Sequence, residues 1–234
     1  MDGKALTEQV RSTYDAVAEV YAARFPSTEP EQPIDLAMID HFLSVLPAGG
    51  AQVLDSGCGT GRMSRYVSDR GCRVRGVDLS PGMIAVARRE HADISTQVAS
   101  ITDLPFPDAE FDGVLLWYSV IHIADEDLPA VFREARRVLR PGGFALIAFQ
   151  SGQGSRDVGG GFRALGYDVR LTRFHRTADD VAEMLASAGL AEQARLVRRP
   201  VIELDDQAFL VVRSLNSDDA AVGSMPSEVA LDAA

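Results

Sequence analysis

Lysine is almost absent from this chain of 234 residues, with Lys4 as its only example. A P-loop ends in Gly-Lys-Ser or Gly-Lys-Thr because its lysine reaches the phosphates of a nucleotide. The sequence therefore excludes a P-loop. Lysine and arginine together number 23 against 34 acidic residues, which gives a formal net charge of −11. Because nucleic-acid-binding proteins usually carry a basic face, we expect a small-molecule partner and no nucleic acid.

Cysteine and long apolar runs are also scarce. The two cysteines, Cys58 and Cys72, and the four scattered histidines match no metal-ligand spacing. We therefore predict neither a disulfide nor a metal site. No apolar run approaches the ~18 residues of a membrane span, and the first residues lack the apolar core of a secretory signal. These absences favour a cytoplasmic protein with no membrane attachment, and they leave a monomer and a homodimer equally open.

Short apolar runs alternate with amphipathic stretches along most of the chain. This alternation predicts an α/β fold with a doubly wound, mostly parallel seven-stranded sheet, helices on both faces and an N-terminal helical extension. The expected helices span 4–25, 34–46, 61–70, 81–90, 125–139 and 177–188. The expected strands span 51–54, 73–77, 94–98, 111–117, 144–149, 196–203 and 207–212.

The same pattern predicts three parts of the chain. Residues 1–47 form the helical extension, and residues 48–214 form a cofactor-binding catalytic domain. Within that domain, the glycine-rich stretch 150–175 is either a mobile linker or an ordered substrate lid. Residues 215–234 contain few large apolar side chains, so we expect a disordered tail.

The stretch Val53–Arg62 combines the end of an apolar run with three glycines, at positions 57, 59 and 61. Glycine permits a sharp turn and a close approach of backbone to ligand. Asp78 follows the next apolar run, where a carboxylate can accept hydrogen bonds from both hydroxyls of a ribose. The pattern indicates a nucleotide-type cofactor site, and the alternative for Asp78 is a residue that caps the following helix.

The details of this loop favour a cofactor without phosphates. A dinucleotide loop has the spacing Gly-x-Gly-x-x-Gly, whereas Arg62 stands here at the third glycine position. Asp55 places a carboxylate beside the turn, which repels a pyrophosphate and suits an ammonium and a sulfonium. A nicotinamide-dependent oxidoreductase and a non-catalytic cofactor-binding module remain as alternatives.

Several motifs together resemble those of class I S-adenosylmethionine-dependent methyltransferases of the small-molecule type. The resemblance spans about residues 10–214, and the matching stretches are Tyr14–Tyr21, Val53–Arg62, Gly76–Arg88, Asp103–Phe106, Phe111–Val114 and Val138–Phe144. It implies transfer of a methyl group from S-adenosylmethionine to an O, N or C atom of a small acceptor, with an aromatic metabolite or natural product as one possibility.

The resemblance also implies roles for individual residues. The methionine part of the cofactor is expected at Asp55, Gly57 and Gly59, the ribose at Asp78, and the adenine at Leu79 and Met83.

Other positions carry expectations with alternatives. Members of this family commonly have an acid near the third strand that contacts adenine, and Ser100 and Ile101 stand in its place here. Trp117, with Tyr118 beside it, is expected to border the reactive methyl group, and its alternative is a core aromatic residue. Tyr14 and Tyr21 are seven positions apart on one helical face. They either close over the cofactor or pack the helix.

His122 is the candidate catalytic residue. It follows the fourth strand of the core in the stretch Trp117-Tyr-Ser-Val-Ile-His122. Its ordinary pKa of about 6.5 suits a general base near neutral pH. The alternatives are a contact to the cofactor or a neighbour, and a loop histidine bonded to backbone. Arg173 and His175 are expected to face the acceptor if the glycine-rich stretch folds over the site.

Overall fold

The computed structural model describes residues 3–215, so the expected disordered tail lies almost entirely outside the described residues. Seven strands form the central sheet in the order β3-β2-β1-β4-β5-β9-β8. Their bounds are β1 Gln52–Ser56, β2 Arg73–Asp78, β3 Ser95–Val98, β4 Phe111–Trp117, β5 Leu139–Ser151, β8 Leu190–Arg198 and β9 Asp206–Ser214.

The direction of the strands confirms the predicted sheet. Neighbours from β3 to β5 run parallel, whereas β9 runs antiparallel to both β5 and β8. The chain leaves β1 toward β2 and β3 on one side and returns to β4 on the other. In doubly wound sheets, ligands bind at the carboxyl ends of the strands where the order reverses. The fold therefore places a binding site above the ends of β1 and β4.

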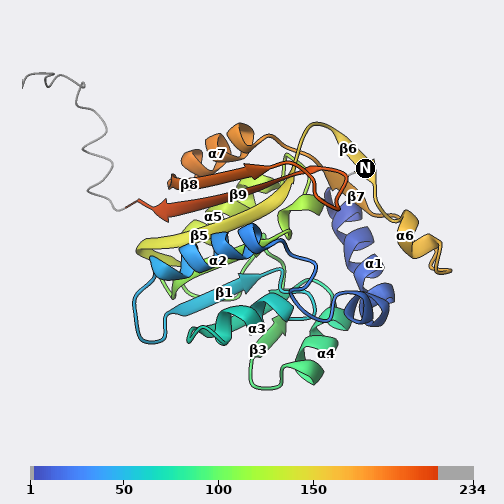
Figure 1. Cartoon of the computed structure of the whole chain (residues 1–234), viewed down its shortest axis with the longest axis horizontal. Helices are drawn as coiled ribbons and strands as arrows, with labels where there is room; N and C mark the ends of the chain where they lie inside the picture. Colours follow the sequence, from blue (N-terminus) through green and yellow to red (C-terminus); the bar gives the residue numbers. More distant parts are fainter. Residues whose placement is uncertain (1–2, 216–234) are drawn as a thin grey trace, which may run out of the picture.

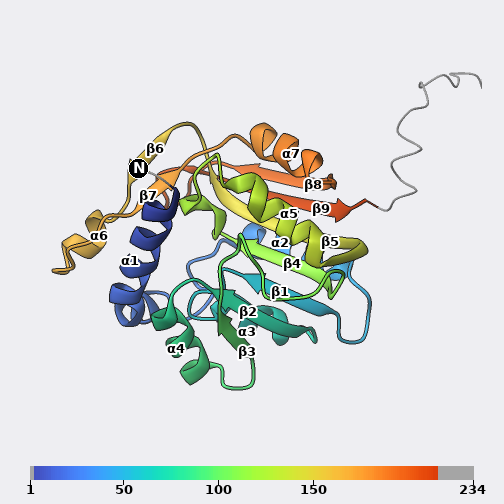
Figure 2. The ribbon, with the colours of Figure 1, turned by 180° about the vertical axis from the view of Figure 1, so that it is seen from behind.

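Helices cover both faces of the sheet (Figures 1 and 2). Helices α5 (Leu128–Val138) and α7 (Ala178–Ser187) pack into one apolar core with β4 and β5. Helices α2 (Pro33–Ser44) and α3 (Arg62–Ser68) pack into the other. Because α2 contributes fully buried side chains to a core under the sheet, it is packed as a layer of the main fold. The predicted boundary at residue 47 stays a prediction.

Helix α1 (Gly3–Arg24) lies against α4 (Pro81–Glu90) and forms the roof of the expected site. Asp15 on α1 accepts hydrogen bonds from Ser80 Oγ at 2.6 Å and from the Gly82 backbone N–H at 2.9 Å. A Cβ at Gly82 would lie 3.1 Å from the Asp15 carbonyl oxygen, so the missing side chain permits this close approach. The carboxylate of Asp15 thus fastens the roof to the first turn of α4.

The glycine-rich stretch is ordered in part. Strands β6 (Ser155–Asp157) and β7 (Thr172–Phe174) pair antiparallel, with the short helix α6 (Gly160–Arg163) between them. We call residues 155–174 the hairpin. It lies beside α1 in both views of the ribbon (Figures 1 and 2), and Thr13 Oγ1 donates to the Arg170 carbonyl oxygen at 3.0 Å. The hairpin and α1 therefore meet over the carboxyl edge of the sheet.

Some predicted bounds were wrong. Strand β5 begins at Leu139, five residues earlier than expected, because the segment between Leu139 and Phe144 forms a bulge opposite β4 rather than a separate turn. Strand β8 spans 190–198 rather than 196–203. Helix α5 begins at Leu128, three residues later than predicted.

Other features of the described residues bear on the setting of the protein. Both cysteines are free. Across 3–215, no group of three His, Cys, Asp or Glu side chains is arranged to hold a metal ion. In the same range, no helix is long and apolar enough to cross a membrane.

Candidate active site

The glycine loop is held by backbone contacts to β2. The N–H groups of Gly57 and Cys58 both donate to the Val77 carbonyl oxygen at 2.8 Å. Gly57 has φ +86°, and a Cβ there would lie 2.3 Å from the Cβ of Ser119, so no larger residue fits. Gly59 has φ +54°, and a Cβ there would meet no atom within 4 Å. The loop thus presents bare backbone to open space.

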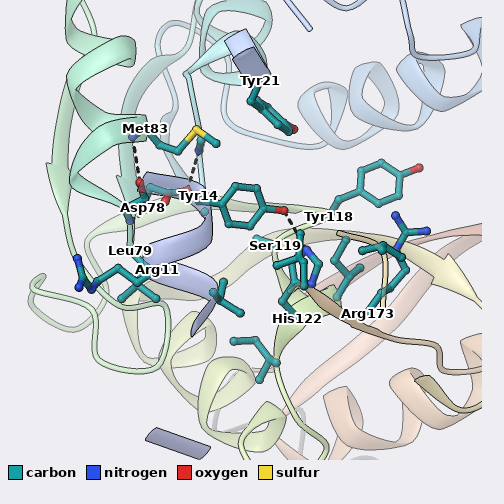
Figure 3. Close-up of a pocket in the computed structure, with 18 of the residues that line it drawn as sticks. Arg11, Tyr14, Tyr21, Asp78, Leu79, Met83, Tyr118, Ser119, His122 and Arg173 are labelled. Carbon is teal, nitrogen blue, oxygen red and sulfur yellow. Dashed lines mark hydrogen bonds between the residues drawn. The ribbon is translucent and has the colours of Figure 1, made fainter. Parts of the chain in front are cut away.

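The ribose contact of Asp78 stays a prediction, and the residue that caps α4 is Ser80 rather than Asp78. Its carboxylate accepts from the Gly59 N–H at 2.9 Å and from the Ser80 N–H at 2.9 Å, so it joins the loop to the start of α4. Asp78 also lines the cavity, where Figure 3 shows it beside Leu79 and Met83. Burial raises the pKa of this carboxyl, against the lowering effect of the backbone N–H groups.

Asp55 lies beneath the loop and is fully buried, and it is not among the residues that line the cavity. Ser64 Oγ donates to its Oδ2 at 2.6 Å, whereas Oδ1 has no hydrogen-bond partner within the described residues. Burial raises the pKa of Asp55 to about 6, and the negative charge of Asp78 adds to this rise. The structure places two carboxylates next to the loop, one on the cavity wall and one below it.

A single cavity of about 1650 Å³ extends from the glycine loop to the hairpin. Every predicted cofactor residue except Asp55 lines it. These residues are Tyr14, Tyr21, Gly57, Gly59, Asp78, Leu79, Met83, Ser100, Ile101 and Trp117. The predicted catalytic residue, His122, lines it as well. Residues that are scattered along the sequence therefore meet around one space.

His122 is buried and its two ring nitrogens are both engaged. Nδ1 lies 2.6 Å from the Thr172 carbonyl oxygen, and Nε2 lies 2.9 Å from the Tyr14 hydroxyl. Because a carbonyl oxygen only accepts, Nδ1 carries the proton and Nε2 accepts from the Tyr14 O–H. Burial lowers the pKa of His122 to about 4, so the ring is neutral at pH 7. Figure 3 shows Tyr14 reaching from α1 to this ring.

Tyr14 and Tyr21 pack against each other at the wall of the cavity. Their rings meet edge to face with centroids 6.1 Å apart, and both line the cavity. Burial raises the pKa of each phenol. Arg62 lines the cavity near Tyr21 and pairs with Glu31 at 2.6 Å. The sequence gave no signal for the Arg62–Glu31 pair, since its members are 31 positions apart.

Trp117 belongs to an apolar core and also lines the cavity, and its place beside the reactive methyl group stays a prediction. Its ring packs on Phe209 with centroids 5.4 Å apart within an apolar core, and it also lines the cavity. The Nε1 atom is buried with no hydrogen-bond partner within the described residues. Near the third strand, Ser100 Oγ lies 2.7 Å from Thr102 Oγ1, so the residue that replaces the family's acid is bonded to its own turn.

The hairpin supplies basic residues to the far end of the cavity. Arg156 and Arg173 line it, and both pair with Asp205 from the β8–β9 connection, Arg173 Nη1 at 3.0 Å. His175 lies 3.3 Å from the same carboxylate but does not line this cavity. The prediction for Arg173 and His175 thus divides, because Arg173 lines the cavity and His175 does not. Asp205 and Arg156 carried no signal in the sequence.

The residues at the glycine loop fit S-adenosylmethionine. The loop offers close backbone approach at Gly59, and Asp78 presents a carboxylate on the wall. Asp55 keeps one oxygen atom without a partner within 3–215 and adds negative charge below the loop. The nearest cation, Arg62, is already paired with Glu31. This donor set suits a nucleoside that carries positive charge and no phosphate.

Comparisons with known proteins agree with this geometry. The profile of a methyltransferase domain family matches residues 53–143. A malonyl-[acyl-carrier protein] O-methyltransferase from Enterobacter lignolyticus is 32% identical over 160 residues, which cover 68% of this chain and 63% of that protein. A demethylmenaquinone methyltransferase from Symbiobacterium thermophilum is 33% identical over 169 residues, which cover 66% of this chain and 64% of that protein.

A solved methyltransferase structure has a similar fold. The crystal structure of Burkholderia thailandensis 1,6-didemethyltoxoflavin-N1-methyltransferase, with that compound and S-adenosylhomocysteine bound, has a TM-score of 0.71. It is 20% identical and covers 92% of each chain. This chain spans 48% to 63% of the length of the first curated relatives it matches. The profile match and the relatives that are 32% and 33% identical show that the chain belongs to the class I S-adenosylmethionine-dependent methyltransferase family.

Proposed function

We propose that this protein transfers a methyl group from S-adenosylmethionine to a small acceptor that binds between the glycine loop and the hairpin. One observation carries the proposal. The loop with Asp78 and the Tyr14–His122 pair open onto the same cavity, so a donor and an acceptor can meet there. Its volume of about 1650 Å³ exceeds the ≈ 300–1,000 Å³ typical of a single-ligand pocket.

The residues of the donor end bind and orient. Gly57 and Gly59 let backbone approach the cofactor, Asp78 accepts from its ribose hydroxyls, and Leu79 and Met83 offer apolar surface for its base. When bound, S-adenosylmethionine would supply a methyl group on a positively charged sulfur, and loss of that methyl group leaves a neutral thioether. The protein then mainly has to align the acceptor atom with that methyl group and to exclude water.

His122 and Tyr14 have different roles in this proposal. His122 Nε2 is occupied by the Tyr14 hydroxyl, and its low pKa makes the ring a weak base. We therefore assign His122 as a positioning residue that fixes the direction of the Tyr14 O–H. The free lone pair of the Tyr14 oxygen can accept a hydrogen bond from the acceptor's O–H or N–H. The predicted direct role of His122 as general base is less favoured by this geometry.

The acceptor atom is left as O, N or C. The relatives named above act on a malonyl group carried by a protein, on a demethylmenaquinone and on 1,6-didemethyltoxoflavin, so the family accommodates different acceptors. We infer a small-molecule acceptor for this chain because the cavity lies under α1 and the hairpin. A cytoplasmic location is part of the same proposal, supported by the two free cysteines.

Two measurements test this function. Calorimetry is expected to show binding of S-adenosylhomocysteine and none of NADH. Incubation of a metabolite extract with isotopically labelled methyl donor is expected to give a labelled small molecule. Binding of NADH instead would favour the oxidoreductase. Binding of S-adenosylhomocysteine with no labelled product from any extract would favour a non-catalytic binding module.

The role of His122 has its own test. Because its pKa is lowered to about 4, kcat/KM for the acceptor, measured at saturating S-adenosylmethionine, should show no inflection near pH 6.5. His122→Gln keeps a hydrogen-bonding side chain and is expected to retain more turnover than His122→Ala. An inflection near pH 6.5 that disappears in both variants would restore His122 as the base.

A further inference from the structure

Two arginines share one carboxylate at the hairpin end of the cavity. Asp205 is a single carboxylate that pairs with two guanidinium groups, those of Arg156 and Arg173. Other acidic side chains nearby have arginine partners of their own cluster. Asp157 pairs with Arg163 at 2.8 Å, and Glu203 pairs at 2.6 Å with Arg198, which also pairs with Asp35. Arg156 and Arg173 therefore have one carboxylate, that of Asp205, between their two positive charges.

Arg173 is the less satisfied of the two arginines. Its Nη1 donates to Asp205, and its Nε is buried with no hydrogen-bond partner within residues 3–215. Burial lowers the pKa of this guanidinium, which shows that its charged form is held at a cost. Buried guanidinium groups usually have their donors satisfied by carboxylates or other oxygen atoms. Within residues 3–215, no protein group accepts a hydrogen bond from the Nε of Arg173.

The position of Arg173 connects it to the reaction. Its neighbour in β7, Thr172, supplies the carbonyl oxygen that binds His122 Nδ1. The guanidinium is close enough to His122 to lower the pKa of that ring, and close enough to Tyr14 to act on its phenol. Figure 3 shows Asp78 and Met83 on one side of Tyr14 and Arg173 on the other. A group bound at Arg173 therefore lies next to the Tyr14 hydroxyl.

Neighbouring polar atoms on the cavity wall also lack partners. Trp117 Nε1 and Ser119 Oγ are buried, line the same cavity and have no hydrogen-bond partner within the described residues. An indole N–H only donates. The N–H groups of Trp117 and Arg173 are both free to donate to a ligand that carries acceptor oxygens.

From these contacts we propose that the methyl acceptor carries a carboxylate, which Arg173 binds with the help of Arg156. This inference rests on the proposed function and adds the chemical class of the acceptor. Its carboxylate faces the hairpin while a separate nucleophilic atom lies at the Tyr14 hydroxyl. The cavity then matches a cationic donor at its acidic end with an anionic acceptor at its basic end.

A matched pair of probes tests this assignment. Fluorine NMR is used to titrate 4-fluorobenzoate and 4-fluorobenzamide into protein saturated with S-adenosylhomocysteine. The two probes have nearly the same shape and differ in charge. The carboxylate is expected to bind about tenfold or more tightly than the amide, because a charge-assisted bidentate contact is among the strong hydrogen bonds. Arg173→Gln is expected to remove this difference, and Arg173→Lys to retain part of it.

The control is Arg133→Gln, which makes the same change of net charge on the exposed face of α5, away from the cavity. It should keep the preference for the carboxylate. Equal binding of both probes, a preference that survives Arg173→Gln, or no detectable binding of 4-fluorobenzoate at millimolar concentration would overturn the inference. Calorimetry with S-adenosylhomocysteine on the same samples separates the two proposals, since failure of that binding contradicts the proposed function instead.

Discussion

At the glycine-loop end of the cavity, Asp55 and Asp78 lie close together beside backbone N–H groups, and burial raises the pKa of both carboxyls. At the hairpin end, Arg156 and Arg173 share the single carboxylate of Asp205. The first end is built mainly by the backbone of one strand–loop–helix unit. The second is built by side chains of the hairpin and of the β8–β9 connection. The two ends of the cavity thus differ in the charged groups that they present and in construction.

This difference suggests a division of labour. A site made by backbone geometry at the end of a rigid sheet binds the same ligand in many related proteins, because few side chains are involved. A site made by side chains on a small hairpin can change its specificity by substitution, without disturbing the sheet. We expect changes at the first end to affect cofactor binding and changes at the second to affect the acceptor.

The largest expected effect comes from Gly57→Ala. At φ +86° a left-handed alanine costs about 1–2 kcal/mol, and the new Cβ would lie 2.3 Å from Ser119 Cβ. Such overpacking adds about 1–3 kcal/mol, so the sum of about 2–5 kcal/mol should lower affinity for S-adenosylhomocysteine by about 30-fold or more. The control is Gly71→Ala, where φ is +88° but a Cβ meets no atom within 4 Å. Calorimetry and chemical denaturation that find both variants alike would show that the clash is relieved.

Asp78→Asn and Arg173→Gln together test whether only the glycine-loop end of the cavity binds the cofactor. It removes a charged acceptor from the cavity wall and disturbs the bonds to Gly59 and Ser80. Affinity for S-adenosylhomocysteine should fall about 10- to 100-fold. Arg173→Gln should change that affinity by no more than about twofold, since bonds to Asp205 and not to the glycine loop hold it. If Arg173→Gln weakens cofactor binding as much as Asp78→Asn, the proposed division between the ends is wrong.

Tyr14→Phe lies between the two ends and should affect turnover rather than cofactor affinity. Removal of the hydroxyl leaves His122 Nε2 buried without its donor, which should cost about 1–3 kcal/mol of stability. Turnover of the acceptor found by labelled-methyl screening should fall about tenfold. Tyr66→Phe is the matched control, because that hydroxyl bonds Asp40 outside the cavity. Unchanged turnover in Tyr14→Phe would remove Tyr14 from the proposed acceptor site.

The smallest effect concerns Asp55 and pH. The pKa of Asp55 in the folded protein is about 6, above the ordinary 3.8, so ionisation of this carboxyl destabilises the fold. The contribution of Asp55 to the free energy of unfolding therefore grows as pH falls from 6 toward 4. A bound cation favours the ionised form, so affinity for S-adenosylmethionine should decrease a few-fold between pH 7.5 and 5.5. S-adenosylhomocysteine, without the sulfonium, should change less. Asp55→Asn should flatten the difference, which calorimetry at several pH values can measure.

Local motifs account for most of what the sequence predicted correctly. The helix predicted over 81–90 is α4, and its first turn is capped by Ser80 Oγ, which accepts from the Met83 N–H at 3.1 Å. Strand β4 was predicted with its observed bounds because consecutive apolar residues filled it. The hairpin was not predicted, since its strands are three residues long and contain charged side chains without alternation.

The sequence by itself determined the glycine-loop end of the cavity. Gly57, Gly59 and Asp78 lie within one contiguous unit, where spacing and glycine alone specify a strand, a turn and an acid at fixed relative positions. Only the tertiary structure decided the hairpin end. The bond between Tyr14 and His122 joins residues 108 positions apart, and the contact of Arg173 with Asp205 spans 32 positions. Such pairs depend on how helices and hairpins pack above the sheet. The periodicity of a sequence predicts individual helices and strands but not how distant elements pack together.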